Sequence, residues 1–297
     1  PEPTQGAPKE PVAAVLALAE ALRQSDLQRY AELSLPPERH AQRKTLWQHQ
    51  VATKNPFSAE QAEHYAELMQ LLAAPDAEAQ VWKRVEPRIA AVEQEAGPKW
   101  AMGVTMLSGF AATAIAANPT LSEAEKNHAS GVVDAITVWA KNQAQFTDRE
   151  RAKQAVAVAV RTARELDLPT LEAIETIEYE ALLAKGGVAF RGIKAIATAY
   201  GIDVDGALSQ VQAEVIQLDG PRARVRVRYP LLGETVTFEQ PMILIDGGWY
   251  REDAIQALDA AFAEAGPETL AALAGRAPAT APAAAVEPAR PAVDSQP

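Results

Sequence analysis

The sequence predicts a mainly α-helical chain with a small antiparallel sheet near its C-terminus, an α+β fold. Two observations carry this prediction. Apolar residues recur at steps of three and four over most of the first 200 residues, which is the period of an amphipathic helix. From Val211 they alternate with polar residues, which is the period of a strand, and Asp219-Gly220 supplies a hairpin turn. We therefore expect a multi-helix body, then a sheet of three or four strands and a closing helix.

The first half of the chain divides into helices at recognisable start and stop signals. The first helix is expected over residues 12–22 and the second over about 38–52. Ser58 is an expected N-cap for a third helix, and Asp76 begins a fourth. Pro87 lies inside the fourth pattern, so we expect a kink or a break there.

Two later helix starts carry the capping-box pattern, in which Ser or Thr is followed three residues later by Glu. They are Ser122 with Glu125 and Thr147 with Glu150, and an apolar-periodic run follows each. Another helix is expected over residues 188–200, ended by Gly201, which is a typical C-terminal stop.

The expected strands follow this last helix. They cover residues 211–218, 222–229 and 235–245, and Pro241 can break the third because proline donates no ladder hydrogen bond. A turn at 246–248 leads into a short run that includes Trp249 and Tyr250. The closing helix is expected over residues 253–265.

Proline placement and the change of period predict four segments. Residues 1–11 hold four prolines and form an expected tether, and residues 275–297 hold five prolines among many alanines and form an expected disordered tail. Between them we expect a helical domain over 12–185 and an α+β domain with the sheet over 186–274. One interpretation of these two segments is that they are spacers between the folded part and an anchor. The other is that they are irregular chain ends without a function, which have the same composition.

Composition excludes several kinds of chemistry. The chain has no cysteine, so it forms no disulfide, no thiolate metal site and no thiol nucleophile. With 28 basic and 39 acidic side chains the net charge is −11, which argues against a general nucleic-acid binder. It has no Gly-rich phosphate loop, dinucleotide fingerprint or nucleophile elbow. We assign no catalytic residue and no cofactor.

The histidines do not predict a metal site. None of the four falls at a compact ligand spacing with another, so we assign no metal ligand. We expect solvated side chains on helices for all of them, namely His40, His49, His64 and His128.

One segment resembles a membrane span in its lack of charge. Residues 100–122 contain no charged side chain. A spanning helix needs about 20 predominantly apolar residues. Here glycine, serine and threonine dilute the hydrophobicity, and Pro119 ends the helix early. We therefore favour a buried central helix over a membrane helix, and expect membrane attachment only through an anchor upstream of residue 1.

The most distinctive local pattern lies in the second expected strand. Alternation places four guanidinium groups on one face, those of Arg222, Arg224, Arg226 and Arg228, and Ala223, Val225, Val227 and Tyr229 on the other. One interpretation is a cationic ridge for an acidic partner, and the other is the wet face of a sheet with Glu214 or Glu239 as cross-strand partners. Trp249 and Tyr250 are either core or sheet-edge residues or a ligand platform.

The C-terminal run, from Val225-Arg226-Val227 through Ile243-Leu244-Ile245-Asp246-Gly247-Gly248-Trp249-Tyr250, resembles the ending of bacterial envelope proteins of the nuclear-transport-factor-like type, many of them lipoproteins. The segment from Ala19 to Leu33 is similar to their opening helix. A long helical region separates the two parts here, unlike in that family. The resemblance implies an envelope location and a binding role, and no catalytic residue carries over.

Two main functional hypotheses follow. The first is a non-enzymatic protein of the bacterial envelope that binds another protein. It would lie in the periplasm, after cleavage of a signal peptide, and be held there by a lipid anchor. An immunity-type inhibitor of a toxin is one version, with Arg222, Arg224, Arg226, Arg228, Trp249 and Tyr250 as the contact residues. The second is a module that binds or transforms a small ligand in a pocket between helices and sheet. A helical scaffold is a third. A pocket with convergent polar groups favours the second, and an exposed patch without a cavity favours the first.

Overall fold

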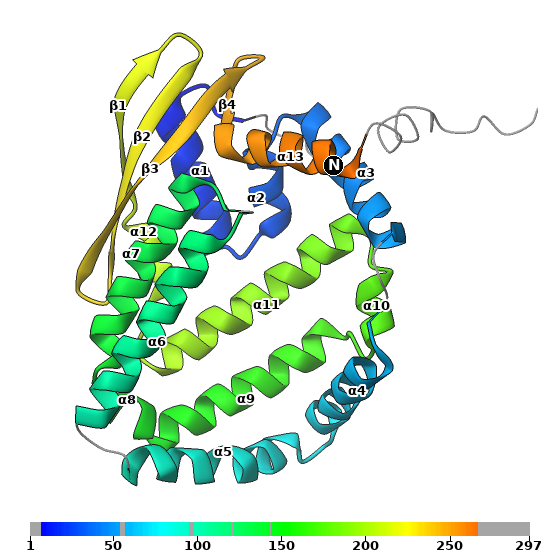
Figure 1. Cartoon of the computed structure of the whole chain (residues 1–297), viewed down its shortest axis with the longest axis vertical. Helices are drawn as coiled ribbons and strands as arrows, with labels where there is room; N and C mark the ends of the chain where they lie inside the picture. The colour runs from blue at the N-terminus through cyan, green and yellow to red at the C-terminus, as the bar shows by residue number, and fades with distance from the viewer. Residues whose placement is uncertain (1–6, 54–56, 95–97, 120, 143, 267–297) are drawn as a thin grey trace, which may run out of the picture.

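The computed structural model describes residues 7–53, 57–94, 98–119, 121–142 and 144–266. The predicted fold class is confirmed: a multi-helix body is joined to one small antiparallel sheet, and a helix closes the described chain (Figure 1). The helices before the sheet are α1 (Pro11–Arg23), α2 (Leu27–Ser34), α3 (Pro37–Thr53), α4 (Ala59–Ala73), α5 (Ala77–Gln94), α6 (Pro98–Ala117), α7 (Glu123–Ala140), α8 (Ala144–Thr147), α9 (Arg149–Leu166), α10 (Leu171–Glu175), α11 (Tyr179–Ala199) and α12 (Val204–Ser209).

The sheet has its strands in chain order, β1-β2-β3-β4, and every neighbouring pair is antiparallel. Its strands are β1 (Gln212–Asp219), β2 (Arg222–Leu231), β3 (Glu234–Ile245) and β4 (Gly248–Arg251), and α13 (Glu252–Ala265) follows directly. Strand β3 continues through Pro241, opposite Arg224, so the possible break is absent.

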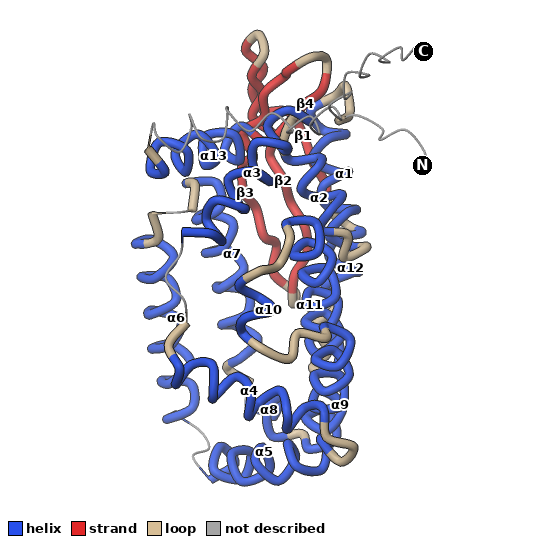
Figure 2. Tube along the Cα trace, turned by 90° about the vertical axis from the view of Figure 1, so that its right-hand side faces the viewer, coloured by secondary structure: helices blue, strands red, loops and turns tan. Residues whose placement is uncertain are grey.

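One face of the sheet packs on helices from the N-terminal half of the chain. Val225, Val227, Met242 and Trp249 form a buried cluster with Ala14 and Val15 of α1. A second cluster joins Ala135 of α7 to Val236 of β3. Figure 1 shows α1 and α7 lying against the sheet, and Figure 2 shows the strands behind them from the side. Residues far apart in sequence therefore build one core.

Helix α11 corrects the expected domain boundary between residues 185 and 186. It runs unbroken from Tyr179 to Ala199 and contains Gly186 and Gly187 in its interior. A Cβ at Gly187 would lie 2.5 Å from the carbonyl oxygen of Ser25, closer than packed atoms can approach. The glycine is required by close packing on the turn before α2, and the two expected domains share both this helix and the sheet core.

Most of the expected helix starts are confirmed, with two exceptions: the helix expected from residue 188 begins at Tyr179, and Thr147 does not cap α9. Ser58 and Ser122 both accept the predicted capping hydrogen bonds, from Gln61 and Glu125 respectively. The predicted Thr147 box is wrong: Asp148 caps α9, because its carboxylate accepts from two backbone N–H groups of the first turn. Helix α5 continues through Pro87.

The expected buried central helix is wrong. Helix α6 packs along α7 only on one side, and none of its apolar window from Lys99 to Ala117 is buried. Other helices pack against more than one neighbour. Helix α9 contacts both α5 and α11, and α4 contacts both α5 and α9.

The expected N-terminal tether lies partly outside the described residues, which begin at residue 7. Residues 7–10 contact β4: the backbone N–H of Trp249 donates to the carbonyl of Pro8 at 3.0 Å. Helix α1 begins at Pro11, a favoured first position for proline. The expected tail over 275–297 lies outside the described residues.

Candidate ligand-binding cavity

A cavity of about 520 Å³ lies between the inner face of the sheet and helices α1, α7, α11 and α12. Pockets for small molecules have volumes of roughly 300–1,000 Å³. Its walls are mostly aliphatic and aromatic. The apolar lining includes Val15, Leu18, Ala19, Leu22, Val132, Ile136, Ala197, Ile202, Ala207, Leu208, Val227, Leu231 and Phe238.

The periodicities of the sequence explain these walls. On α7, His128, Val132 and Ile136 recur every four residues, so they share one face of the helix. On β2, Val227 and Tyr229 alternate with the arginines, so they point to the opposite side of the sheet. The amphipathic patterns therefore turn both elements toward a common space.

The cavity is open to solvent between α7 and α11. Ile136 and Ile193 line it, yet their exposed fractions are 40% and 61%. An apolar molecule could enter on this side without crossing the sheet, because the lining of the opening is itself apolar.

A histidine–tyrosine pair gives the cavity a polar contact. The Nε2 atom of His128 lies 2.7 Å from the hydroxyl oxygen of Tyr229, and the imidazole stacks on Phe238 with 4.1 Å between ring centroids. Burial, helped by the nearby Arg251, lowers the pKa of His128 below 6.5. Burial also raises the pKa of Tyr229 to about 12. Both rings are therefore uncharged at neutral pH, and the pair can donate or accept one hydrogen bond.

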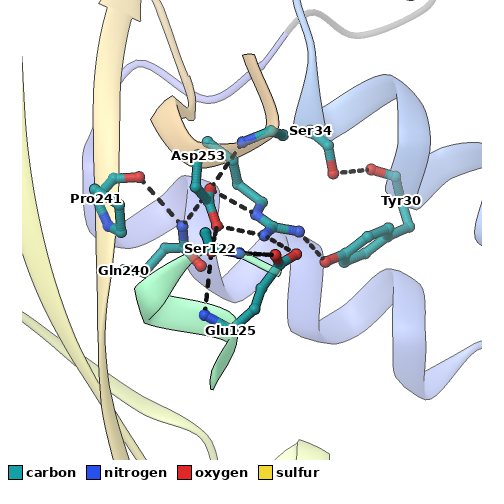
Figure 3. A network of polar contacts seen from close by, with 9 residues as sticks. Tyr30, Ser34, Ser122, Glu125, Gln240, Pro241 and Asp253 are labelled. Atoms are coloured by element: carbon teal, nitrogen blue, oxygen red, sulfur yellow. Dashed lines mark hydrogen bonds and ion pairs between the residues drawn. The ribbon is translucent and has the colours of Figure 1, made fainter. Parts of the chain in front are cut away.

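The buried guanidinium of Arg251 forms the centre of a polar network at the cavity wall. Figure 3 shows this network, with the partners Tyr30, Glu125 and Asp253 labelled. It donates to both carboxylate oxygens of Asp253, to the Tyr30 hydroxyl at 2.7 Å and to Glu125 at 2.8 Å. Burial by itself disfavours the charge, but Tyr30, Asp253 and Glu125 more than offset this and raise the pKa of Arg251 above its usual value.

The same network joins five elements, namely α2, α7, β3, β4 and α13. Glu125 accepts from the backbone N–H of Ser122 and so also caps α7. Asp253, at the start of α13, accepts from Gln240 of β3 at 2.9 Å and from the Ser122 hydroxyl at 3.1 Å. One guanidinium therefore faces two carboxylates, so the polar groups at this wall provide no free positive charge for an anionic ligand.

The four arginines predicted as a cationic ridge lie together on the outer face of β2. Each has an acidic partner: Arg222 pairs with Glu252 at 2.8 Å, Arg224 with Glu239 at 3.4 Å, and Arg228 with Glu214. Arg226 lies between Glu214 and Glu239, at 3.4 and 3.6 Å. For Arg224, Arg226 and Arg228 this arrangement is the wet sheet face with cross-strand partners, the second interpretation of the pattern, whereas the partner of Arg222 lies on α13.

Trp249 and Tyr250 are buried, with exposed fractions of 5% and 6%. Trp249 belongs to the cluster beneath the sheet, as the core interpretation predicts. Tyr250 packs at residues 7 and 248, and burial raises its pKa. Neither side chain lines the cavity or forms an exposed contact surface in this structure.

The sequence does not predict the polar residues of the cavity as a site. The prediction that His128 is solvated is wrong: the side chain faces the cavity and lies on the same face of α7 as Val132. The sequence places Tyr229 in the inward-facing series on β2, and the hydroxyl that distinguishes it from Ala223, Val225 and Val227 is the signal that could have identified it. Arg251 carried no distinguishing sequence signal, because its partners come from positions up to 221 residues away.

Comparisons with known proteins found no similar protein or family: no protein-family model, no curated protein and no solved structure matches the chain. Among the described residues, no group of three His, Asp or Glu side chains is placed to hold a metal ion.

Proposed function

We propose that this protein binds a small, uncharged, largely apolar molecule in the cavity between α1, α7, α11, α12 and the sheet. The observation that carries the proposal is an apolar cavity of about 520 Å³ with the uncharged His128–Tyr229 pair in its wall. A pocket with polar groups in its wall favours the hypothesis of a ligand-binding module over that of a protein that only binds another protein.

The charges of the wall support an uncharged ligand. Arg251 is the one cationic side chain among the lining residues, and Asp253 and Glu125 already pair with it. A carboxylate or phosphate would enter next to an extra negative charge and would lose its hydration. A neutral molecule avoids both costs and can use the Tyr229 hydroxyl for one hydrogen bond.

A fluorescent probe tests this proposal. The neutral probe N-phenyl-1-naphthylamine should bind the full chain with a large rise in fluorescence and a stoichiometry near one. It should bind more tightly than the anionic probe 1-anilinonaphthalene-8-sulfonate, because the wall repels a sulfonate.

A matched pair of variants locates the binding. Ala197→Phe fills the cavity from α11 and should weaken probe binding at least tenfold, whereas Ala181→Phe adds the same ring on an exposed part of the same helix and should leave it unchanged. Equal binding by both variants, or no binding by the wild type, would overturn the proposal.

The hypothesis of an envelope protein that binds another protein stays a prediction. The pairing of the β2 arginines and the burial of Trp249 and Tyr250 leave little of the contact surface on which it was based. The periplasmic location and the lipid anchor likewise stay predictions.

A further inference from the structure

The outward face of α6 carries four large apolar side chains that are exposed to solvent. Met102, Met106, Leu107 and Phe110 have exposed fractions of 67%, 60%, 71% and 67%. The residues facing α7 are small or aliphatic and follow the three-and-four spacing of one helix face, beginning with Ala101, Val104 and Ser108. Figure 2 shows α6 at one edge of the molecule, beside α7. The helix is therefore packed on one side and open on the other.

We infer that this face of α6 lies against a lipid bilayer. The helix has 20 residues, which at 1.5 Å per residue makes it about 30 Å long. No charged side chain occurs from residue 100 to residue 122, and the window from Lys99 to Ala117 has a mean hydropathy of 1.4. Among the described helices it alone is long and apolar enough to cross a membrane.

The polar groups on α6 favour lipid over a protein partner. The hydroxyls of Thr105 and Thr113 donate to the carbonyls of Ala101 and Gly109 within the helix, each at 2.9 Å. The outward face therefore offers almost no free hydrogen-bonding group. A protein interface carries about one hydrogen bond per 100–200 Å² and a polar rim, whereas the acyl chains of a bilayer require neither.

The packing of α6 indicates that it lies along the bilayer surface instead of crossing it. Its N-terminal end is fixed, because the Trp100 indole donates to the carbonyl of Ala140 at the end of α7 and the ring packs on Phe146. Helix α7 carries Glu123, Lys126 and Asp134, which cannot follow α6 into hydrocarbon. Only the outward face can enter, to a depth of about 5–10 Å.

The net charge of −11 sets the lipid dependence of this contact. An acidic protein is repelled by an anionic surface, so the attraction must come from burial of apolar side chains. Binding should therefore be stronger to zwitterionic phosphatidylcholine vesicles than to vesicles rich in phosphatidylglycerol.

Flotation of the full chain with phosphatidylcholine vesicles tests the inference. The wild type should float with the vesicles, and Met106→Asp with Phe110→Asp should reduce the bound fraction at least tenfold. The matched control is Leu218→Asp on β1, an equally exposed apolar position at 63% exposure, and it should float like the wild type. Absence of flotation by the wild type, or equal loss in the control, would overturn the inference.

A second measurement does not depend on introducing charge. Because the chain has no cysteine, Met106→Cys and Leu218→Cys each provide a single labelling site. A polarity-sensitive nitrobenzoxadiazole label should brighten severalfold with vesicles at position 106 and stay unchanged at position 218. A wild type that forms dimers through α6, with no change of the 106 label on vesicles, would identify a second copy as the occupant and overturn the lipid assignment.

Discussion

The two faces of the sheet carry arginines in opposite environments. On the outer face, the four β2 arginines stand in solvent, with side-chain exposures between 37% and 66%, and pair with glutamates of β1, β3 and α13. On the inner face, Arg251 has a side-chain exposure of 10% and pairs with Asp253, Glu125 and Tyr30. Water screens the outer charges, so each pair contributes little, whereas every partner of the buried charge is needed to offset its lost hydration.

This difference indicates which face of the sheet is the better candidate for a ligand site. The outer face has the more conspicuous sequence pattern, yet its charges are neutralised by their neighbours. The inner face has an irregular set of polar residues around an apolar cavity, and two of them, His128 and Tyr229, have pKa values shifted by burial. Perturbed groups in a concave site are the stronger indication of a ligand site.

The largest expected effect comes from Arg251→Met. The substitution leaves the Asp253 and Glu125 carboxylates next to each other without their cation, and removal of one partner from a buried ion network costs about 3–5 kcal/mol. Urea unfolding measures this loss. Arg222→Met is the matched control on the outer face and should change the free energy of unfolding by less than about 1 kcal/mol. Similar losses in the two variants would remove the contrast between the faces.

The next effect concerns packing beneath the sheet. Met242 is 0% exposed on the inner side of β3, and Met242→Ala should lower the free energy of unfolding by about 2–5 kcal/mol because it opens a void in the core. Thr237→Ala, on the exposed side of the same strand, should stay within about 0.5 kcal/mol. Thermal unfolding followed by circular dichroism compares them, and a loss for Thr237→Ala as large as that for Met242→Ala would contradict the assignment of faces.

A smaller effect depends on pH and on His128. Its pKa in the folded protein lies below the ordinary value of 6.5, so between these two values the unfolded chain binds the proton and the folded chain does not. Stability should therefore fall as pH drops below about 6.5, by at most about 1.4 kcal/mol per pH unit for this one group.

His128→Phe serves as the control for that pH dependence. Phenylalanine keeps a ring on Phe238 but cannot titrate, so the variant should lose less stability than the wild type between neutral and mildly acidic pH. Identical pH profiles in urea unfolding would show that His128 is not buried in an uncharged state.

The smallest effect is expected for Arg226→Ala. It removes two long ion pairs from the outer face, and exposed pairs contribute about 0.2–1 kcal/mol, less in high salt. Chemical unfolding at low and high salt provides the measurement. A loss of several kcal/mol would mean that the outer arginines form a structural network.

The sequence by itself determined the fold class of this protein, most of its long helices and the two faces of its sheet. Periodicity located the strands and these helices, and capping signals located the starts of α4 and α7, because these features depend on interactions over a few residues. The short helices α2, α10 and α12 were not predicted, because each has too few turns to show a helical period. The same local information misplaced the domain boundary at Gly186-Gly187. Gly187 is required there because it packs closely on the backbone of Ser25, which is far away in the chain.

Only the tertiary structure decided which residues meet. The cavity joins residues of α1, α7, α11, α12 and the sheet, and the Arg251 network joins positions up to 221 residues apart. The exposure of α6 was likewise beyond the sequence, because an apolar helix without charges has the same composition whether it is buried in protein or open on one side. Local patterns fix which side of an element is apolar, and the packing of distant elements fixes what that side faces.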